Sequence, residues 1–415
     1  MDEKSSIVFT PAHIGQLQIK NRLVRSATTE RAATERGEVS DFLIDIYRTL
    51  AQGGVGLIIT GYCAANTNSL GAHTIRADDD YFIPSLSRIP RVVREADPDC
   101  KVILQLGHYG KQAVTQARAT KLVPFAPPAF LSYWRKHPEI MGTSGQPQQI
   151  VPELAAPAPS VIYDALFDCN TRALTLEEID SIVDSFASAI CRAKEADYDG
   201  VQLHAAHGYL LSTFLSPRTN HRLDEYGGST ENRVRIIREI YERARREVGD
   251  AFPILIKMNT TDFLPGGIDI KEAVNIGKLI VEAGIAAIET SGGMWESVTR
   301  PKDELDWLPV LLPEARTGIK EREQEGYFLP GAVALKEKTK ATIILVGGLR
   351  SFSRIEEILN SGAADFAALC RPLIRQPDLP NIWKSGKGED KAECISCTAC
   401  YPAGVDRFGC RAKMK

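Results

Sequence analysis

The stretch TIILVGGLRSFSRIEEILNSGAADFAALCR, residues 342–371, contains two short apolar runs on either side of an amphipathic segment. Residues 342–348 and 365–371 are almost continuously apolar before their last positions, which predicts two strands buried on both faces. Residues 352–360 repeat apolar side chains with helical spacing. A strand, a helix and a second strand in this order form a parallel βαβ unit. The stretch therefore predicts a parallel sheet covered by helices.

The same alternation occurs eight times along the chain. The predicted strands are residues 23–28, 56–62, 102–108, 200–204, 253–259, 286–292, 342–348 and 365–371. The predicted helices are residues 41–52, 85–96, 176–196, 231–248, 270–283, 328–338, 352–360 and 379–384. Eight such units predict the α/β class and a closed (β/α)8 TIM barrel. The first unit lacks the GxGxxG turn that opens a Rossmann domain, which disfavours an open doubly wound sheet.

Residues 112–173 interrupt this alternation, because they contain many prolines and show little helical periodicity. A long loop in a compact domain is usually functional. Since it follows the third predicted strand, we expect it to form a lid over the C-terminal face of the barrel. We expect two parts in all: residues 1–385 as the barrel with this loop, and residues 386–415 as a short cysteine-rich C-terminal extension.

The composition is that of a soluble globular protein, with 415 residues that are 44% hydrophobic and 25% charged. The net charge of −3 provides no basic field for nucleic acid or an anionic membrane. No apolar run approaches the roughly 20 residues that span a bilayer. The charged N-terminus also lacks the apolar core of a signal peptide. We therefore expect a cytoplasmic protein with no nucleic-acid or membrane partner.

Residues 204–209, HAAHGY, follow the fourth predicted strand. His204 and His207 are an odd number of residues apart, so a continuing strand would turn them to opposite faces. A strand that ends at His204 and is followed by a turn would let both rings converge with Tyr209. Two hydrogen-bond donors and a phenol suit an enzyme that stabilises developing negative charge and supplies a proton.

Each of these residues also has another interpretation. The two histidines could ligate zinc, although no carboxylate or third histidine stands at ligand spacing. Tyr209 could be a packed core phenol. At the seventh and eighth strand ends, Gly347 and Gly348 precede a helix and Arg371 follows. Backbone N–H groups and a guanidinium there predict a phosphate site, with an ordinary glycine turn beside a surface arginine as the alternative.

Several motifs match one known family. They are IGxLxIKNRLV at 14–24, QLGHxGKQ at 105–112, HAAHGYL at 204–210, FLSP at 214–217, DEYGGSxENR at 224–233 and RP at 371–372. With these motifs, which extend over about residues 9–379, the chain resembles the Old Yellow Enzyme family of NADH:flavin oxidoreductases. The resemblance implies that the barrel, residues 1–385, binds FMN non-covalently and takes electrons from NAD(P)H.

The resemblance also implies roles for single residues. Ala27, Thr28 and Thr29 would lie along the flavin near its N5 edge, Gly61 would contact the ring through its backbone, and Gln105 would hydrogen-bond the pyrimidine edge. Lys257 stands where most members have an arginine beside N1 and O2, and a cation there stabilises the anionic reduced flavin. The phosphate would be bound by Gly347, Gly348, Cys370 and Arg371. His204 and His207 would hold the substrate's oxygen, and Tyr209 would protonate the carbon opposite the hydride.

The last part of the chain carries a cysteine motif, formed by Cys394, Cys397, Cys400 and Cys410. This spacing is typical of thiolates that bind a metal. A 4Fe–4S cluster, a structural zinc and unmetallated thiols all remain open. Relatives in the branch of trimethylamine dehydrogenase and 2,4-dienoyl-CoA reductase carry a cluster at this point. Their last loop is longer, which leaves the fourth ligand open here.

We therefore predict an ene-reductase that moves hydride from NAD(P)H through flavin N5 to a small α,β-unsaturated substrate, with Tyr209 as proton donor. One alternative is a cluster-linked amine dehydrogenase or dienoyl-CoA-type reductase, which would need an electron-transfer partner protein. Another is a flavin-binding electron-transfer subunit of a complex. A homo-oligomer is expected.

Overall fold

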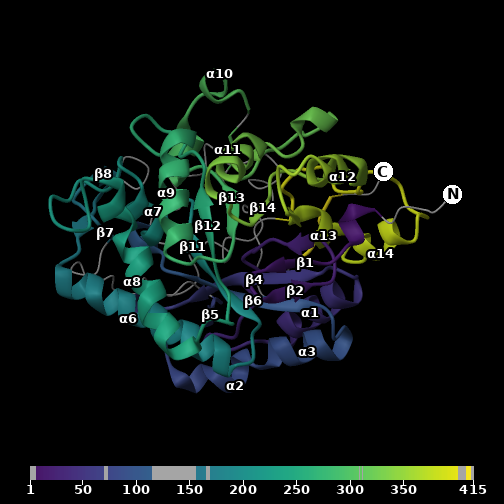
Figure 1. The fold of residues 1–415 in the computed structure, drawn as a ribbon, viewed down its shortest axis with the longest axis horizontal. Coiled ribbons are helices and arrows are strands. Elements are labelled where there is room, and N and C mark those ends of the chain that lie inside the picture. The colour runs from purple at the N-terminus through teal and green to yellow at the C-terminus, as the bar shows by residue number, and fades with distance from the viewer. Residues whose placement is uncertain are drawn as a thin grey trace.

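In the computed structural model, eight parallel strands form one closed ring surrounded by helices (Figure 1). The structure describes residues 6–69, 73–114, 156–164, 169–307, 309–310, 312–400 and 408–412. In order around the ring, the strands are β3 (Leu23–Arg25), β15 (Phe366–Leu369), β14 (Ile343–Leu345), β13 (Ile288–Ser291), β12 (Ile254–Asn259), β11 (Gly200–Ala205), β6 (Lys101–Gly107) and β4 (Leu57–Ala64). Since β3 also pairs with β4, the sheet closes and the predicted TIM barrel is confirmed.

The helices that pack around the ring follow the predicted units. They are α1 (Asp41–Gln52), α2 (Ile83–Leu86), α3 (Arg88–Ala96), α6 (Leu176–Glu195), α8 (Thr230–Val248), α9 (Ile270–Glu282), α11 (Leu329–Thr339), α12 (Phe352–Asn360) and α14 (Leu379–Lys384). The predicted single helix 85–96 is wrong, because α2 and α3 are separate. Pro90 has no N–H to continue the helical hydrogen bonds back into α2.

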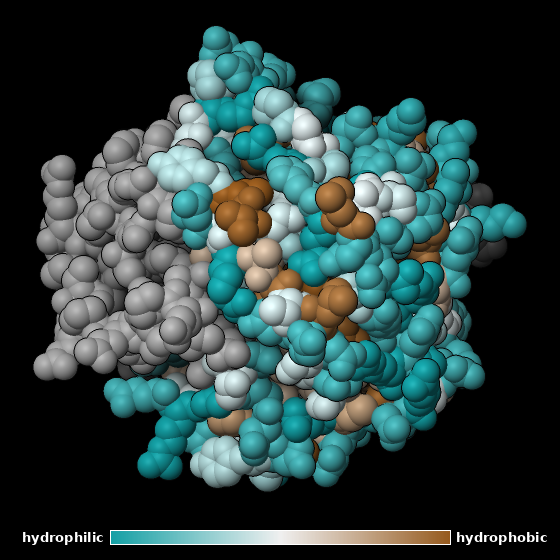
Figure 2. Space-filling model, turned by 90° about the vertical axis from the view of Figure 1, so that its left-hand side faces the viewer, coloured by the Kyte–Doolittle hydropathy of each residue, from teal (hydrophilic) through white to brown (hydrophobic). Residues whose placement is uncertain are grey.

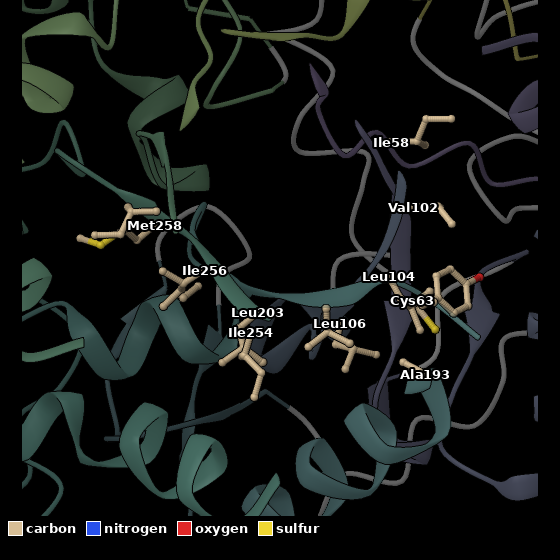
Figure 3. Close-up of a cluster of buried hydrophobic side chains, with 14 of the residues drawn as sticks. Ile58, Cys63, Val102, Leu104, Leu106, Ala193, Leu203, Ile254, Ile256 and Met258 are labelled. Atoms are coloured by element: carbon tan, nitrogen blue, oxygen red, sulfur yellow. The ribbon is translucent and has the colours of Figure 1, made fainter. Parts of the chain in front are cut away.

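Two apolar layers hold the barrel together. Inside the ring, side chains such as Leu57, Ile59 and Phe366 pack together. They are joined by Ile14 and Ile19 of the hairpin β1 (Ala12–Ile14) and β2 (Leu17–Ile19). The next layer lies between strands and helices and is drawn in part in Figure 3, where Ile58, Val102 and Ile256 are labelled. Successive residues of a strand enter opposite layers, which explains why most residues of the strands are apolar.

Three barrel strands end two or three residues earlier than predicted. We expected strands to reach residues 28, 348 and 371, but they end at Arg25, Leu345 and Leu369. The residues that follow leave the sheet and turn over its C-terminal edge. Shorter elements were not predicted: α7 (Leu210–Leu215), α10 (Lys302–Leu305), α13 (Arg371–Arg375), β5 (Ile75–Arg76), β7 (Pro157–Ala158), β8 (Tyr163–Asp164), β9 (Cys169–Asn170) and β10 (Arg172–Ala173).

Most of the predicted lid, residues 115–155 and 165–168, lies outside the described residues. The start of the predicted extension, by contrast, packs against the barrel. The N–H of Phe352 in α12 donates to the carbonyl of Asp390, and the N–H of Ala392 donates to the carbonyl of Arg350, both at 2.8 Å. The division of the chain at residue 385 stays a prediction.

Hydrophilic side chains predominate on the face drawn in Figure 2, where the apolar side chains form small groups. In the part of the chain that the structure describes, none of the helices has the length and hydrophobicity required to cross a membrane.

Candidate active site

A cavity opens at the C-terminal ends of the barrel strands. It is lined by side chains from β6, β11, β12, β13 and β15 and from the segments that follow β3 and β14. The predicted site residues that line it are Ala27, Thr28, Thr29, Gln105, His204, His207, Tyr209, Lys257, Gly348, Cys370 and Arg371. Residues from both ends of the chain are therefore brought together, as expected for a barrel enzyme.

Two predicted residues, Gly61 and Gly347, do not appear in the lining of the cavity. A side chain on Gly61 would collide with Glu30 and with the carbonyl of Thr28, so this glycine lets the segment after β3 pack against β4. Gly347 has a φ of +134° and its carbonyl accepts hydrogen bonds from the N–H groups of Gly326 and Tyr327. Both glycines shape the wall of the cavity, and direct contact with a cofactor stays a prediction for them.

His204, His207 and Tyr209 converge at one side of the cavity. Strand β11 ends at Ala205, and His207 then takes a φ of +62°, which turns the chain. As a result the ring centres of His204 and His207 are 5.1 Å apart, and that of Tyr209 is 4.6 Å from His204. These rings can meet only if the chain turns after the strand, and the chain turns at His207.

Both histidines are neutral in this environment. Burial, together with the nearby Lys257, lowers the pKa of His204 to about 3. Burial also lowers the pKa of His207 well below its ordinary value, with further contributions from His204 and Lys257. The Nδ1 atom of His204 is buried and has no hydrogen-bond partner among the described residues. A neutral imidazole with one unsatisfied nitrogen can bind a polar atom of a ligand in the cavity.

An aromatic wall stands beside these histidines. The rings of Tyr62 and Tyr109 are stacked with centres 4.5 Å apart, and Tyr109 meets Tyr209 edge-on at 5.5 Å. Ser69 holds this pair, because its hydroxyl oxygen accepts the N–H of Tyr109 at 2.8 Å and lies 2.5 Å from the hydroxyl of Tyr62. Tyr109 and Tyr209 line the cavity, so a flat ligand would meet aromatic surface there.

The floor of the cavity is a polar network that crosses four strands. The Nε2 atom of Gln105 donates to Oε1 of Gln202 at 2.8 Å, and Nε2 of Gln202 donates to Glu289 at 2.7 Å. Lys257 forms an ion pair with Glu289 at 3.0 Å and also donates to the hydroxyl of Ser26 at 3.0 Å. The sheet register explains the contacts, since Gln105 lies opposite Gln202 and Lys257 opposite Glu289.

The other end of the cavity carries two guanidinium groups. Arg371 donates to the carbonyl of Arg316 at 2.8 Å, and Arg350 donates to the carbonyls of Cys394 and Ile319. Among the described residues neither guanidinium is paired with a carboxylate, and the Nε atom of Arg350 has no partner. Two cations without anions suit the phosphate of a ligand.

The helix amides expected to help with phosphate are already occupied. Glu325 accepts the N–H groups of Arg350 and Ser351 at 2.8 Å and the hydroxyl of Ser351 at 2.7 Å. The N-terminus of α12 is therefore capped from within the protein. A phosphate would instead depend on Arg350, Arg371 and the loop at Gly348, which all line the cavity. Gly348 has a φ of +73°.

The residues of the cavity fit FMN in kind. The pyrimidine edge of a flavin alternates acceptor oxygens with an N–H group, and Gln105 and Lys257 offer the matching amide and ammonium. The unpaired guanidiniums at the opposite end suit the phosphate. Glu314 also lines the cavity, and burial raises the pKa of its carboxyl.

The four cysteines of the C-terminal motif do not form a metal site in the described part of the chain, where no three His, Cys, Asp or Glu side chains converge. Cys400 lines the cavity, while residues 401–407, on the way to Cys410, are outside the described ones. The structure therefore gives no support for a cluster or zinc, and both stay predictions from spacing.

Sequence reasoning missed several residues of the site, namely Ser26, Gln202, Glu289, Ser291, Glu314 and Arg350. Gln202 and Glu289 left a signal, because each is a polar residue inside an otherwise apolar strand. A buried polar side chain in such a position needs a partner, and the partner here is the other member of the same network.

Known protein sequences and structures resemble this chain over nearly its whole length. Residues 7–390 match the sequence profile of the NADH:flavin oxidoreductase / NADH oxidase family. An NADH oxidase of Thermoanaerobacter brockii is 32% identical over 392 residues, covering 94% of this chain and 52% of that protein. A 2-naphthoyl-CoA reductase complex has a TM-score of 0.78 at 25% identity, covering 97% of this chain and 56% of its own. The chain thus spans about half the length of both.

One more solved structure bears on the fold. An Old Yellow Enzyme homologue from Zymomonas mobilis has a TM-score of 0.67 at 22% identity, and the match covers 97% of this chain and 99% of that one.

Proposed function

Because the chain belongs to the NADH:flavin oxidoreductase / NADH oxidase family, we propose that it is an FMN-dependent, NAD(P)H-oxidising enzyme that reduces activated alkenes. The observation that carries this proposal is the grouping of two neutral histidines and a tyrosine on one side of the cavity, beside a floor that suits a flavin. Bound FMN would supply the hydride-transfer chemistry between NAD(P)H and the substrate.

The residues of this chain would do the rest. His204 and His207 are neutral, so each can donate one hydrogen bond to the oxygen of a carbonyl or nitro group. These bonds strengthen as negative charge develops on that oxygen. Tyr209 would then deliver a proton to the α-carbon. Gln105 and Lys257 would bind the pyrimidine edge of the flavin, while Arg350 and Arg371 would hold its phosphate.

The aromatic wall supports a flat, conjugated substrate, since Tyr109 and Tyr209 present their rings to the cavity. The similarity to 2-naphthoyl-CoA reductase makes a conjugated thioester a second substrate class worth assaying. A partner protein for electron transfer and a homo-oligomeric state stay predictions.

The test is an anaerobic spectroscopic titration of protein loaded with FMN. We expect NADH or NADPH to bleach the flavin absorbance, and an α,β-unsaturated ketone to restore it in the absence of oxygen. If NAD(P)H bleaches the flavin but neither an activated ketone nor a conjugated thioester restores it, the reductase proposal is wrong. Restoration by an external one-electron acceptor alone would instead support the electron-transfer subunit.

A further inference from the structure

Glu289 is a buried carboxylate at the centre of the floor network. Its side chain is fully buried in β13. The Oε1 atom accepts the hydroxyl of Ser26 at 2.5 Å and the ammonium of Lys257 at 3.0 Å, and Oε2 accepts Nε2 of Gln202 at 2.7 Å. Ser26 and Lys257 line the cavity and Glu289 does not, so Glu289 influences a ligand without lining its cavity.

The first such influence concerns charge. The Nζ atom of Lys257 is the cation at the floor, and Glu289 balances it at 3.0 Å in a buried setting. The two charges are 3.0 Å apart, so they act from nearly the same place. Solvent screens them weakly inside the protein, so a ligand on the floor feels both. A ligand on this floor therefore meets a pair with little net charge, instead of a free ammonium.

The second influence concerns the orientation of Gln105. A carboxylate only accepts hydrogen bonds, so Gln202 must turn its Nε2 group towards Glu289. This leaves Oε1 of Gln202 to accept from Nε2 of Gln105 at 2.8 Å. The Oε1 atom of Gln105 is then the acceptor left for a ring N–H in the cavity. Glu289 thus determines the donor and acceptor pattern of Gln105 through one intervening side chain.

We propose that Glu289 is a positioning residue that lowers the reduction potential of the flavin bound on this floor. The inference rests on the proposed function, because it needs FMN in the cavity. Two-electron reduction increases the negative charge on the pyrimidine part of a flavin, so a free ammonium at Lys257 would favour the reduced form. Glu289 offsets that ammonium and so keeps the reduced cofactor a strong hydride donor.

The difference between the reduction potentials of bound and free FMN measures how much more tightly the protein binds reduced FMN than oxidised FMN. We expect Glu289→Gln to raise this affinity ratio at least tenfold, which is about 30 mV for a two-electron couple. The potential is read by equilibration with a reference dye, and the dissociation constant of oxidised FMN by fluorescence quenching. Oxidised FMN should bind several-fold more weakly in the variant, because Gln105 loses its fixed orientation.

Glu325→Gln is the matched control. Glu325 is also a buried carboxylate, but it caps α12 at the phosphate end. Since the phosphate keeps its charge when the ring is reduced, this variant should change the affinity ratio less than twofold. A second comparison, made in the Lys257→Met variant, protects the test against misfolding. In that variant Glu289 has no ammonium beside it, and adding Glu289→Gln should again raise the reduction potential of the flavin. The expected order is Glu289→Gln highest, Lys257→Met lowest, and the wild type and the double variant between them.

The outcomes separate the two proposals. If the wild-type protein binds no FMN, the proposed function is wrong and this inference falls with it. If the wild type binds FMN but Glu289→Gln leaves the potential unchanged or lowers it in both backgrounds, the inference is wrong while the proposed function stands.

Discussion

The Nε2 atom of His207 lies 2.7 Å from the hydroxyl oxygen of Ser291, the last residue of β13. Both residues line the cavity. If the hydroxyl donates to Nε2, the proton of the neutral ring is on Nδ1, and His207 has a donor to offer a ligand. If the ring donates to the hydroxyl instead, that donor is lost. The direction of this hydrogen bond is therefore coupled to which nitrogen of His207 carries the proton.

Replacing Ser291 with alanine should slow alkene reduction about fivefold, which corresponds to the loss of roughly one net hydrogen bond of about 1 kcal/mol. The measurement is the single-turnover rate at which an alkene reoxidises the reduced protein. Thr290→Val is the control, because Thr290 is on the same strand and its buried hydroxyl has no partner among the described residues. Equal rates for Ser291→Ala and the wild type would show that Ser291 does not set the tautomer.

Tyr209→Phe removes the predicted proton donor and keeps the aromatic ring. The rate of alkene reduction should fall by about 10²- to 10⁴-fold, the range usual for general acid catalysis. Reduction of the flavin by NAD(P)H needs no proton from Tyr209, so its rate should stay within twofold, which separates catalysis from misfolding. Tyr109→Phe serves as the control, since Tyr109 lines the same cavity. Full activity in Tyr209→Phe would assign the proton to another group.

The strands could be predicted because each barrel strand is buried on both faces, and burial on both faces leaves a largely apolar run such as Leu57–Ala64. The ends of the strands could not be predicted, because no change in local propensity marks them. The strands end where Ala27, Gly348 and Cys370 leave the sheet to line the cavity. His204, His207 and Tyr209 could be predicted as a group, since they are close in sequence.

The floor network could not be predicted, because its contacts depend on sheet register. Lys257 and Glu289 are 32 residues apart, and only the pairing of β12 with β13 places them opposite each other. The capping of α12 by Glu325 is hidden for the same reason, as Glu325 comes from the segment before α11. Contacts between strands or loops that are distant in sequence carry no local pattern.

The cysteine motif predicts iron in protein that is purified without oxygen. A four-thiolate site that holds a 4Fe–4S cluster should give about four iron and four acid-labile sulfide per chain. Cys397→Ser should lose most of this iron, whereas Cys191→Ser, which changes a cysteine in α6, should retain it. One zinc per chain would favour a structural site instead, and the absence of both metals would leave free thiols.

Lys111 joins two segments above the barrel. Its buried ammonium lies 2.6 Å from Oδ2 of Asp164 and also contacts Glu296, next to Trp295 of the cavity wall. Burial alone would lower the pKa of Lys111, but Glu296 and Asp164 together raise it.

Lys111→Met should reduce the free energy of unfolding by about 3–5 kcal/mol, because it leaves buried negative charge without its ammonium. Lys20→Met is the control and should cost less than about 1 kcal/mol, since its ion pair with Asp97 is part-exposed. Denaturant unfolding measures both. If Lys111→Met is as stable as Lys20→Met, the buried group contributes no net stability.

Three buried histidines make the folded protein sensitive to mild acid. Burial lowers the pKa of His108 to about 4 and that of His204 to about 3, and it also lowers the pKa of His207. In the unfolded chain a histidine has a pKa of about 6.5. Below that value the unfolded chain takes up protons that the folded protein does not, so stability is full above about pH 6.5 and is lost as the pH falls.

The expected loss is about 1.4 kcal/mol per pH unit for each histidine that stays neutral in the fold. His204→Gln should therefore reduce the slope of unfolding free energy against pH between about pH 6.5 and 5 by one such contribution. Denaturant titrations of wild type and variant in the same excess of FMN provide the comparison, because other titrating groups contribute equally to both. His13→Gln replaces an exposed histidine of β1 and controls for the substitution itself. An unchanged slope in His204→Gln would mean that His204 is protonated in the folded protein, and an imidazolium there would contradict its role as a neutral donor.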